Sequence, residues 1–234
     1  VAAMSKHLQH RIDTLRERFL PQILDAIQDC VDESTPESSL AVMTDYHLST
    51  GGKRLRALIP LAVADAMGTD PGLLVPFGAA CEILHNATLV HDDLPAMDDD
   101  DLRRGKPTCH KAFDEATAIL TGDALQSLAF HILAKDTTIT ANAAQRLEMI
   151  DTLAVATGSQ GMSGGQAIDL AAVGKSMTLE ELEYMHAHKT GYLIRASVKL
   201  GALSQNQLDD STIKRLDQFA SCIGLAFQIR DDIL

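Results

Sequence analysis

The stretch from His91 to Lys106 combines acidic and basic side chains in a spacing suited to chemistry on phosphates. Six aspartates lie among residues 92–101, and three cations follow at positions 103, 104 and 106. Such close like charges repel one another unless a counter-charge neutralises them. Mg²⁺ is a natural counter-charge because it joins one or two carboxylates to substrate phosphates, which arginine also grips as a bidentate fork. The stretch therefore predicts a metal–diphosphate site, with a solvated acidic surface as the alternative.

The elements around this stretch must hold the first two carboxylates at a helix end. An apolar segment beginning near Pro76 predicts a buried helix that ends at Asp92 and Asp93, because Pro95 prevents its smooth continuation. The C-terminal end of a helix carries partial negative charge, so two carboxylates there favour a bound cation. Asp98 follows a short loop that can fold back, which makes Asp92, Asp93 and Asp98 a candidate ligand set.

A second candidate anion site follows the Gly51-Gly52 pair. A glycine turn before a helix start presents free backbone N–H groups to an anion. Lys53 and Arg56 are three residues apart and are predicted to share a helical face. His85 lies about two helical turns before the first aspartate pair and can reach the same cavity. Taken alone, the motif is equally consistent with a basic surface patch.

Three further polar groups interrupt the apolar second half of the chain. Asp231 and Asp232 follow an apolar helix as the first aspartate pair does, which favours a two-sided metal site. The Lys189–Gly191 segment places a glycine inside a predicted helix, where glycine lowers stability. Gly164–Gln166 and Asp169 lie in a stretch of small residues, where helix–helix contact is the alternative to a functional role.

The composition predicts an all-α protein. Hydrophobic residues make up 46% of the 234 residues, aromatics only 4%, and tryptophan is absent, so the core must be aliphatic. Hydrophobic periodicity predicts helices over 55–67, 76–93, 111–133, 141–160, 179–200 and from 208 onward. Neither a dinucleotide-binding nor a P-loop glycine motif is present. No linker composition divides the chain, so residues 1–234 are predicted to form a single all-α domain.

Charge and composition also narrow the partners and the location. A net charge of −12 argues against nucleic acid, whose phosphates require a basic face. The four isolated cysteines form no CxxC pair and predict neither a zinc site nor disulfides. The longest apolar run, 73–90, contains Glu82, His85 and Asn86 and predicts a buried helix rather than a membrane span. Because residues 1–10 lack a secretory apolar region, the expected location is cytoplasmic.

Taken together, these motifs resemble the trans-polyprenyl diphosphate synthase family, and most closely its bacterial farnesyl-producing members, the geranyltranstransferases. They occur in the family's order and span residues 51 to 232. The matching pieces are Gly51–Arg56, His85, Asp92–Asp98 with Arg103–Gly105, Gly164–Gln166 with Asp169, Lys189–Gly191, Phe227–Gln228 and Asp231–Asp232.

The resemblance implies an antiparallel helix bundle around a deep central cavity, usually dimeric. It also implies condensation of isopentenyl diphosphate with an allylic diphosphate, with Mg²⁺, or Mn²⁺ in its place, as the metal. Asp92, Asp98 and Asp231 would hold the metal, with Asp93 supporting them and Arg103 contacting the allylic diphosphate. Lys53, Arg56, His85 and Arg104 would bind isopentenyl diphosphate. Lys189, Thr190 and Gln228 would line the allylic cation and its leaving group.

Two departures from the family pattern bear on these expectations. The chain ends inside the second aspartate motif, so we expect a domain truncated there, without the family's C-terminal helices. The fifth residue before Asp92 is Ala87, which leaves room for a longer product. A geranylgeranyl-producing enzyme and a non-catalytic subunit are therefore alternatives to the prediction of a farnesyl-producing enzyme. A terpene cyclase needs no second diphosphate site, so Lys53 and Arg56 argue against one, and a metal-binding scaffold is the last rival.

Overall fold

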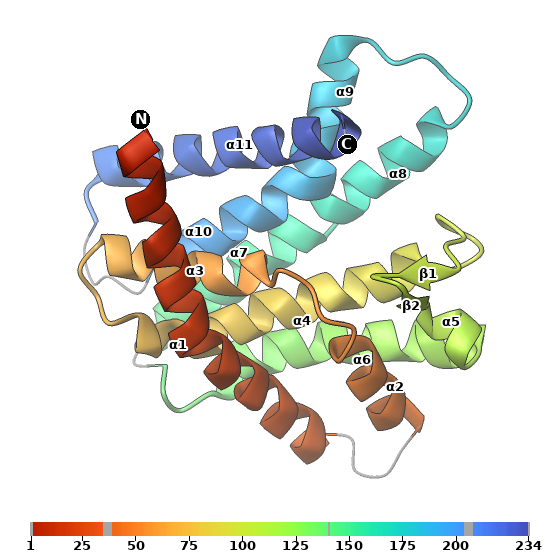
Figure 1. Cartoon of the computed structure of the whole chain (residues 1–234), viewed down its shortest axis with the longest axis horizontal. Coiled ribbons are helices and arrows are strands. Elements are labelled where there is room, and N and C mark those ends of the chain that lie inside the picture. The colour runs from red at the N-terminus through yellow and green to blue at the C-terminus, as the bar shows by residue number, and fades with distance from the viewer. Residues whose placement is uncertain (1, 35–38, 140, 204–207, 234) are drawn as a thin grey trace. The chain divides into compact units, whose positions relative to one another are not determined.

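A computed structural model describes the backbone of residues 2–34, 39–139, 141–203 and 208–233 (Figure 1). Side chains at 2–5, 33–34, 39 and 230–233 lie outside the described part. The described residues form helices, apart from one short hairpin of two two-residue strands and the connecting loops. This architecture confirms the all-α prediction. It divides into two compact units, Val1–Ala62 with Asp70–Ile139 and Val63–Thr69 with Thr140–Leu234. The membership of both units in one domain stays a prediction.

The first unit is built around two long helices that pack side by side, α4 (Val75–Asp92) and α6 (Glu115–Lys135) (Figure 1). Around them lie α1 (Ala2–Ser34), α2 (Ser39–Leu48), the start of α3 (Leu55–Ala66), η1 (Pro71–Leu74) and α5 (Cys109–Ala112). One core cluster beneath the acidic loop contains the buried side chains of Met43, Val90, Leu94, Cys109 and Ala118. This cluster ties the end of α4 to α2, α5 and α6.

Helix α4 forms where the apolar run and its proline predicted it. Pro76 lies in the first turn, where its missing N–H costs nothing. Most of its residues are buried, including Glu82 and Asn86. By length and composition, Pro71–Asp92 is the single described segment that could cross a membrane, yet 72% of its most apolar window is buried inside the protein. This burial agrees with the prediction of a core helix.

A short hairpin follows the acidic loop, with β1 (Leu102–Arg103) antiparallel to β2 (Lys106–Pro107). Its two turn residues, Arg104 and Gly105, both have positive φ angles, of 53° and 81°. This combination is typical of a type I′ turn, which usually uses asparagine or glycine at the first position. Because arginine stands there, residues 102–107 contain no sequence signal for a hairpin.

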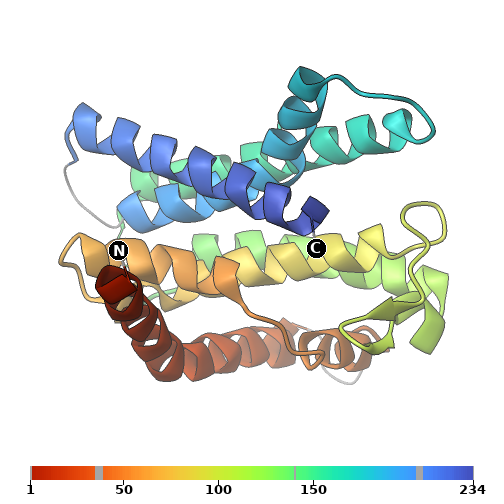
Figure 2. The same cartoon turned by 45° about the horizontal axis from the view of Figure 1, so that its top comes forward.

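The second unit contains α7 (Ala143–Thr157), α8 (Met162–Ala172), α9 (Leu179–His186), η2 (Ala187–Gly191), α10 (Tyr192–Leu203) and α11 (Asp210–Ile233) (Figure 2). Capping boxes begin two of these helices. Asn142 caps α7 and Thr178 caps α9, each with the third residue of its helix returning the hydrogen bond. The π-helical segment η2 packs against α8 and α11.

Two predicted helices differ in detail from those in the structure, and one helix was not predicted. The helix expected over 111–133 begins at Glu115, because Asp114 accepts a hydrogen bond from the Thr117 N–H (2.8 Å) and caps it. The helix expected over 179–200 contains the π-helical turn η2. Helix α8 was not predicted, because its first turn contains Gly164 and Gly165.

Candidate active site

The first acidic motif folds back on the end of α4, as the sequence predicted. The backbone N–H of Asp98 donates to the carbonyl of Asp92 (2.9 Å). The N–H groups of Met97 and Asp99 both donate to the carbonyl of Leu94 (2.9 and 3.1 Å), which closes the loop. Asp92 is half-buried and Asp98 is exposed. The backbone therefore brings the two aspartates expected to bind metal next to each other at the helix end.

Asp93 faces the protein interior, where Arg103 from the hairpin neutralises it. Arg103 Nε donates to Asp93 Oδ1 (2.9 Å), and Nη2 donates to the same oxygen. A further bond from Nη2 reaches Asp100 Oδ2 (3.2 Å). Burial raises the pKa of Asp93 above its ordinary value, and Arg103 opposes that rise. The interaction is therefore a buried ion pair that joins the hairpin to α4.

The predicted set of three shared carboxylate ligands is not formed. Asp93 is fully buried against Arg103. Among the described residues, no three His, Cys, Asp or Glu side chains converge on a point where a metal could be held. Asp92 and Asp98 nevertheless fit Mg²⁺, which needs only one or two carboxylates when substrate phosphates and water complete its shell.

The predicted basic cluster lies beside α4 in the same unit. Arg56 Nη1 is 3.2 Å from His85 Nε2. Because a guanidinium only donates, this histidine nitrogen must accept, and the ring is neutral. Burial, followed by the charges of Arg56 and Arg104, holds the pKa of His85 well below its ordinary value. The imidazole thus stays uncharged among cations.

Lys53 lies in the turn before α3 and is exposed. The prediction that Lys53 and Arg56 share a helical face was wrong, because α3 begins only at Leu55. The intervening residue, Arg54, has a φ angle of 51°, so the chain is not helical there. The turn, rather than helical spacing, determines where Lys53 lies.

Arg104 closes over the glycine turn from the hairpin. Its Nη1 group donates to the carbonyl of Gly51. A Cβ atom at Gly52 would lie 2.6 Å from Arg104 Cζ, and the φ angle of Gly52 is 118°. The backbone conformation therefore requires glycine at this position, and a larger residue would also displace the Arg104 guanidinium.

A buried cysteine–histidine contact lies under the same turn. Cys109 Sγ and His47 Nδ1 are 3.4 Å apart. Burial raises the pKa of Cys109 to about 12. Burial, with the charges of Arg104 and Arg54, lowers the pKa of His47 to about 3. Because both groups stay neutral, the pair is a core contact and not an activated nucleophile.

The second unit brings its predicted polar residues together around η2. Lys189 Nζ donates to Asp169 Oδ2 of α8 (2.5 Å). The Thr190 hydroxyl donates to Gln228 Oε1 of α11 (2.8 Å). A Cβ atom at Gly165 would lie 2.2 Å from the backbone nitrogen of Lys189, so the two segments touch through backbone. The glycine, the π-helical turn and the two hydrogen bonds fix Lys189 and Thr190 in one unit.

Sequence reasoning missed the residues that anchor the basic turn. Arg54 is buried and bonds Glu82 Oε1 (2.7 Å) and Asn86 Oδ1 (3.3 Å) of α4. The available signal was Glu82 itself, because an acidic residue inside an apolar helix requires a buried partner. The pairing of Asp169 with Lys189 was also missed.

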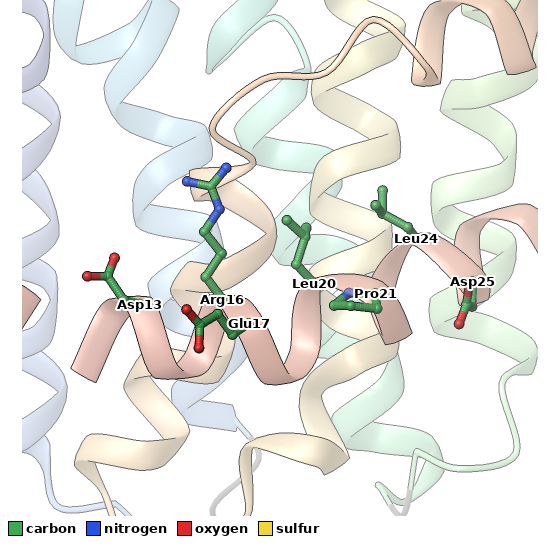
Figure 3. Close-up of a pocket in the computed structure, with 7 residues that line it drawn as sticks. All are labelled: Asp13, Arg16, Glu17, Leu20, Pro21, Leu24 and Asp25. Atoms are coloured by element: carbon green, nitrogen blue, oxygen red, sulfur yellow. The ribbon is translucent and has the colours of Figure 1, made fainter. Parts of the chain in front are cut away.

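Two remaining features add nothing to the predicted site. The side chain of Asp231 lies outside the described residues, although α11 continues through its backbone. Figure 3 shows a hollow along α1 whose lining is confined to that helix. The lining residues are Asp13, Arg16, Glu17, Leu20, Pro21, Leu24 and Asp25, none of which was predicted to act in the site.

Comparison with known proteins places this arrangement in a family. The polyprenyl synthetase family profile matches residues 37–234. The chain belongs to the polyprenyl synthetase family. It is 45% identical over 222 residues to a farnesyl diphosphate synthase of Geobacillus stearothermophilus, covering 93% of this chain and 74% of the relative. It is 52% identical over 189 residues to a farnesyl diphosphate synthase of Escherichia coli K12, covering 81% of this chain and 63% of the relative.

A solved structure extends the likeness to the fold. The crystal structure of a geranyltransferase from Legionella pneumophila superposes with a TM-score of 0.89 at 37% identity. The match covers 95% of this chain and 79% of the other. The polyprenyl synthetase assignment thus rests on sequence and fold together, while the chain spans 63% and 74% of the two curated relatives' lengths.

Proposed function

We propose that this polyprenyl synthetase condenses isopentenyl diphosphate with an allylic diphosphate, first dimethylallyl and then geranyl diphosphate, to give farnesyl diphosphate, with Mg²⁺, or Mn²⁺ in its place. Each condensation releases one inorganic diphosphate. The observation that carries the proposal is the pairing of two different anion sites within one unit. The folded-back Asp92–Asp98 loop suits a metal-bound diphosphate, and the Arg56–His85–Arg104 cluster suits a second diphosphate. The printed names of the relatives support the same reaction.

The chain's own residues divide the work between the two substrates. When bound, Mg²⁺ would supply Lewis-acid stabilisation of the leaving diphosphate. Asp92 and Asp98 would hold it, with Asp231 contributing from α11. Arg103 would contact the allylic diphosphate while keeping Asp93 neutralised. Lys53, Arg56, His85 and Arg104 would bind isopentenyl diphosphate, so that its alkene faces the allylic carbon.

In the second unit, Lys189, Thr190 and Gln228 would line the allylic cation. The Lys189 ammonium suits the departing diphosphate, and the Thr190 and Gln228 oxygens suit positive charge. After the new carbon–carbon bond forms, a proton is lost. We propose that the departed diphosphate is the base that accepts it.

The farnesyl product is proposed over a geranylgeranyl product, although Ala87 argues for the longer chain. Ala87 is buried on α4 one turn before the first aspartate pair. Product analysis by chromatography with labelled isopentenyl diphosphate and geranyl diphosphate decides between the two. A fifteen-carbon product supports the farnesyl reading, a twenty-carbon product the alternative, and no product from the full-length protein a non-catalytic subunit.

We propose further that the protein is a cytoplasmic homodimer. The helix α6 exposes Ile119 and Leu120 beside its buried face, which a second copy would cover. Light scattering of the full-length protein tests the dimer. A monomer at micromolar concentration would contradict it.

The role of Asp92 is tested by its replacement with alanine. Asp92→Ala removes a proposed metal ligand, so turnover should fall by about a thousandfold or more, while far-ultraviolet circular dichroism stays unchanged. Asp99→Asn, in the same exposed loop, is the matched control and should keep near wild-type turnover, since asparagine tolerates the φ angle of 51° at that position. Loss of helical signal in Asp92→Ala would instead make the acidic loop a structural element.

A further inference from the structure

The side chain of Arg54 points away from the surface that its motif was predicted to form. Its neighbours Lys53 and Arg56 are exposed and half-buried, whereas Arg54 retains only 5% of its exposed area. Its Nη1 group donates to Glu82 Oε1 (2.7 Å) and Asn86 Oδ1 (3.3 Å), and Nη2 donates to the carbonyl of Leu48. One guanidinium therefore joins the end of α2 to α4.

The partners of Arg54 are themselves held in place. Glu82 and Asn86 are one helical turn apart on α4, and Asn86 Nδ2 donates to both the carbonyl (2.7 Å) and Oε1 (3.1 Å) of Glu82. All three side chains are buried, at 5% exposure or less. A buried charged network of this kind is rigid when satisfied, because breaking one bond leaves a charge unpaired.

The backbone of Arg54 carries a conformational cost that indicates a purpose. Its φ angle of 51° places a non-glycine residue in the left-handed region. Such residues persist where the surrounding structure determines them, and they cluster at functional sites. Here the conformation turns the Arg54 side chain inward while the chain changes from the glycine turn to α3.

We propose that Arg54 is a positioning residue for the isopentenyl diphosphate site: its buried pair with Glu82 and Asn86 fixes the Gly51–Lys53 turn against α4, next to His85. This inference rests on the proposed function. Arg54 does not itself contact substrate, because its guanidinium is buried and bonded to α2 and α4. It sets where Lys53, Arg56 and the Gly51 carbonyl lie, and Gly51 in turn receives Arg104.

A purely electrostatic role makes the opposite prediction. Glu82 is a carboxylate paired with Arg54, and its negative charge also favours the charged form of Arg104. Glu82→Gln therefore increases the net positive charge around the diphosphate. If charge alone mattered, this change would lower the KM for isopentenyl diphosphate. If Glu82 anchors Arg54, the same change loosens the turn and raises that KM.

The test measures KM for each substrate separately in Arg54→Lys and Glu82→Gln of the full-length protein. Arg54→Lys keeps the charge but loses the fork that reaches three acceptors. We expect both variants to raise the KM for isopentenyl diphosphate about tenfold, as expected for losing a charge-assisted hydrogen bond. The KM for geranyl diphosphate should change less than about twofold, because the Asp92–Asp98 loop is untouched.

The matched control is Arg195→Lys, which alters an exposed arginine paired with Asp217 (2.7 Å) in the second unit. It should leave both KM values unchanged. Calorimetric binding of both isopentenyl diphosphate and geranyl diphosphate to each variant separates folding failure from positioning, since an unfolded variant binds neither substrate and a variant with a displaced turn still binds geranyl diphosphate. If Arg54→Lys or Glu82→Gln fails to fold, Asn86→Ser, which disturbs the same network less, is measured in its place.

The outcomes distinguish this inference from the proposed function. A wild-type protein that neither forms product nor binds isopentenyl diphosphate overturns both. An active wild-type protein with an unchanged isopentenyl diphosphate KM in Arg54→Lys overturns the positioning role alone. A lower KM in Glu82→Gln overturns it in favour of electrostatics.

Discussion

At the scale of single residues, arginines organise the site as much as the aspartates do. Arg103 and Arg104 contact groups that the motifs identify, namely Asp93 and the Gly51 carbonyl, and Arg54 contacts Glu82, which lies outside the motifs. Two of them, Arg54 and Arg104, have left-handed backbone conformations. These arginines hold the acidic loop and the basic turn in shape before any substrate binds.

The Asp93–Arg103 pair should contribute to stability as well as to the site. Arg103→Met leaves the Asp93 carboxylate buried without its partner, which should lower the free energy of unfolding by about 2–3 kcal/mol. Urea denaturation of the variant measures this loss. The double variant Arg103→Met with Asp93→Asn should recover part of it, because no uncompensated charge remains.

The control for this pair is Lys199→Met, which breaks an exposed ion pair with Glu148 (3.3 Å). It should cost less than about 0.5–1 kcal/mol, the usual worth of a surface pair. If the two single variants cost the same, the buried pair has no special role in stability.

At the scale of elements, the π-helical turn η2 presents Lys189 and Thr190 to their partners. A π-bulge inserts an additional residue into a helical turn and is frequent at functional sites. Helix α8 approaches it at Gly165, and α11 approaches it at Gly224, whose added Cβ would lie 3.0 Å from the Gly191 Cα. The spacing of these three segments therefore depends on the absence of side chains.

Gly165→Ala should separate α8 from η2. Its new methyl group would meet the Lys189 backbone at 2.2 Å, and backbone cannot move aside as a side chain can. We expect a loss of about 1–3 kcal/mol in the free energy of unfolding, as for other overpacked cores, and a lower kcat as Lys189 leaves Asp169. Thermal denaturation and steady-state kinetics measure the two effects.

Gly191→Ala is the matched control, because its Cβ would find its nearest neighbour at 3.8 Å, an ordinary contact. Alanine also suits a helix better than glycine, so this variant should be as stable as the wild type or slightly more so. Equal destabilisation by both substitutions would mean that glycine is needed for flexibility in η2 rather than for close approach.

At the scale of the whole molecule, the buried neutral histidines make stability depend on pH. The pKa of His47 falls from 6.5 to about 3 on folding. Below pH 6.5 the unfolded chain binds a proton that the folded chain refuses, so stability is lost as the pH falls from 6.5 towards 3. The loss from one such group approaches about 1.4 kcal/mol per pH unit. His85 acts in the same direction.

Urea denaturation at pH 7, 6 and 5 measures this dependence. His47→Gln should reduce the slope of unfolding free energy against pH, whatever it does to stability at pH 7. His7→Gln, at an exposed position of α1, is the matched control and should leave the slope unchanged. An unaltered slope in His47→Gln would mean that other groups cause the acid sensitivity.

The sequence predicted the parts of this fold that depend on local signals. The apolar run with Pro76 predicted α4, and Pro95 predicted that Asp98 folds back towards Asp92. Composition predicted the all-α class, and the motifs predicted the family. For α4 and the folded-back loop, a short stretch contains all the information that the inference needs, whereas the class and the family rest on composition and on motifs spread over residues 51 to 232.

The remainder depends on contacts between distant residues. The pairing of Arg54 with Glu82 joins residues 28 positions apart, and no local pattern assigns that partner. The π-helical turn and the Arg104 turn violate ordinary propensities, since tertiary contacts determine both. Helical spacing failed for Lys53 for the same reason, because the left-handed Arg54 delays the start of α3 to Leu55.

Helix α4 also determines the distance and the angle between the residues of the two proposed diphosphate sites. His85 and Asp92 lie seven residues apart on it, which amounts to about 10 Å of axial rise and nearly two whole turns. Adding a single alanine after Thr88 would advance Asp92 by about 1.5 Å and rotate it by about 100° around the helix axis relative to His85. The phase of the helix, and not only its composition, thus keeps the two proposed diphosphate sites in register with each other.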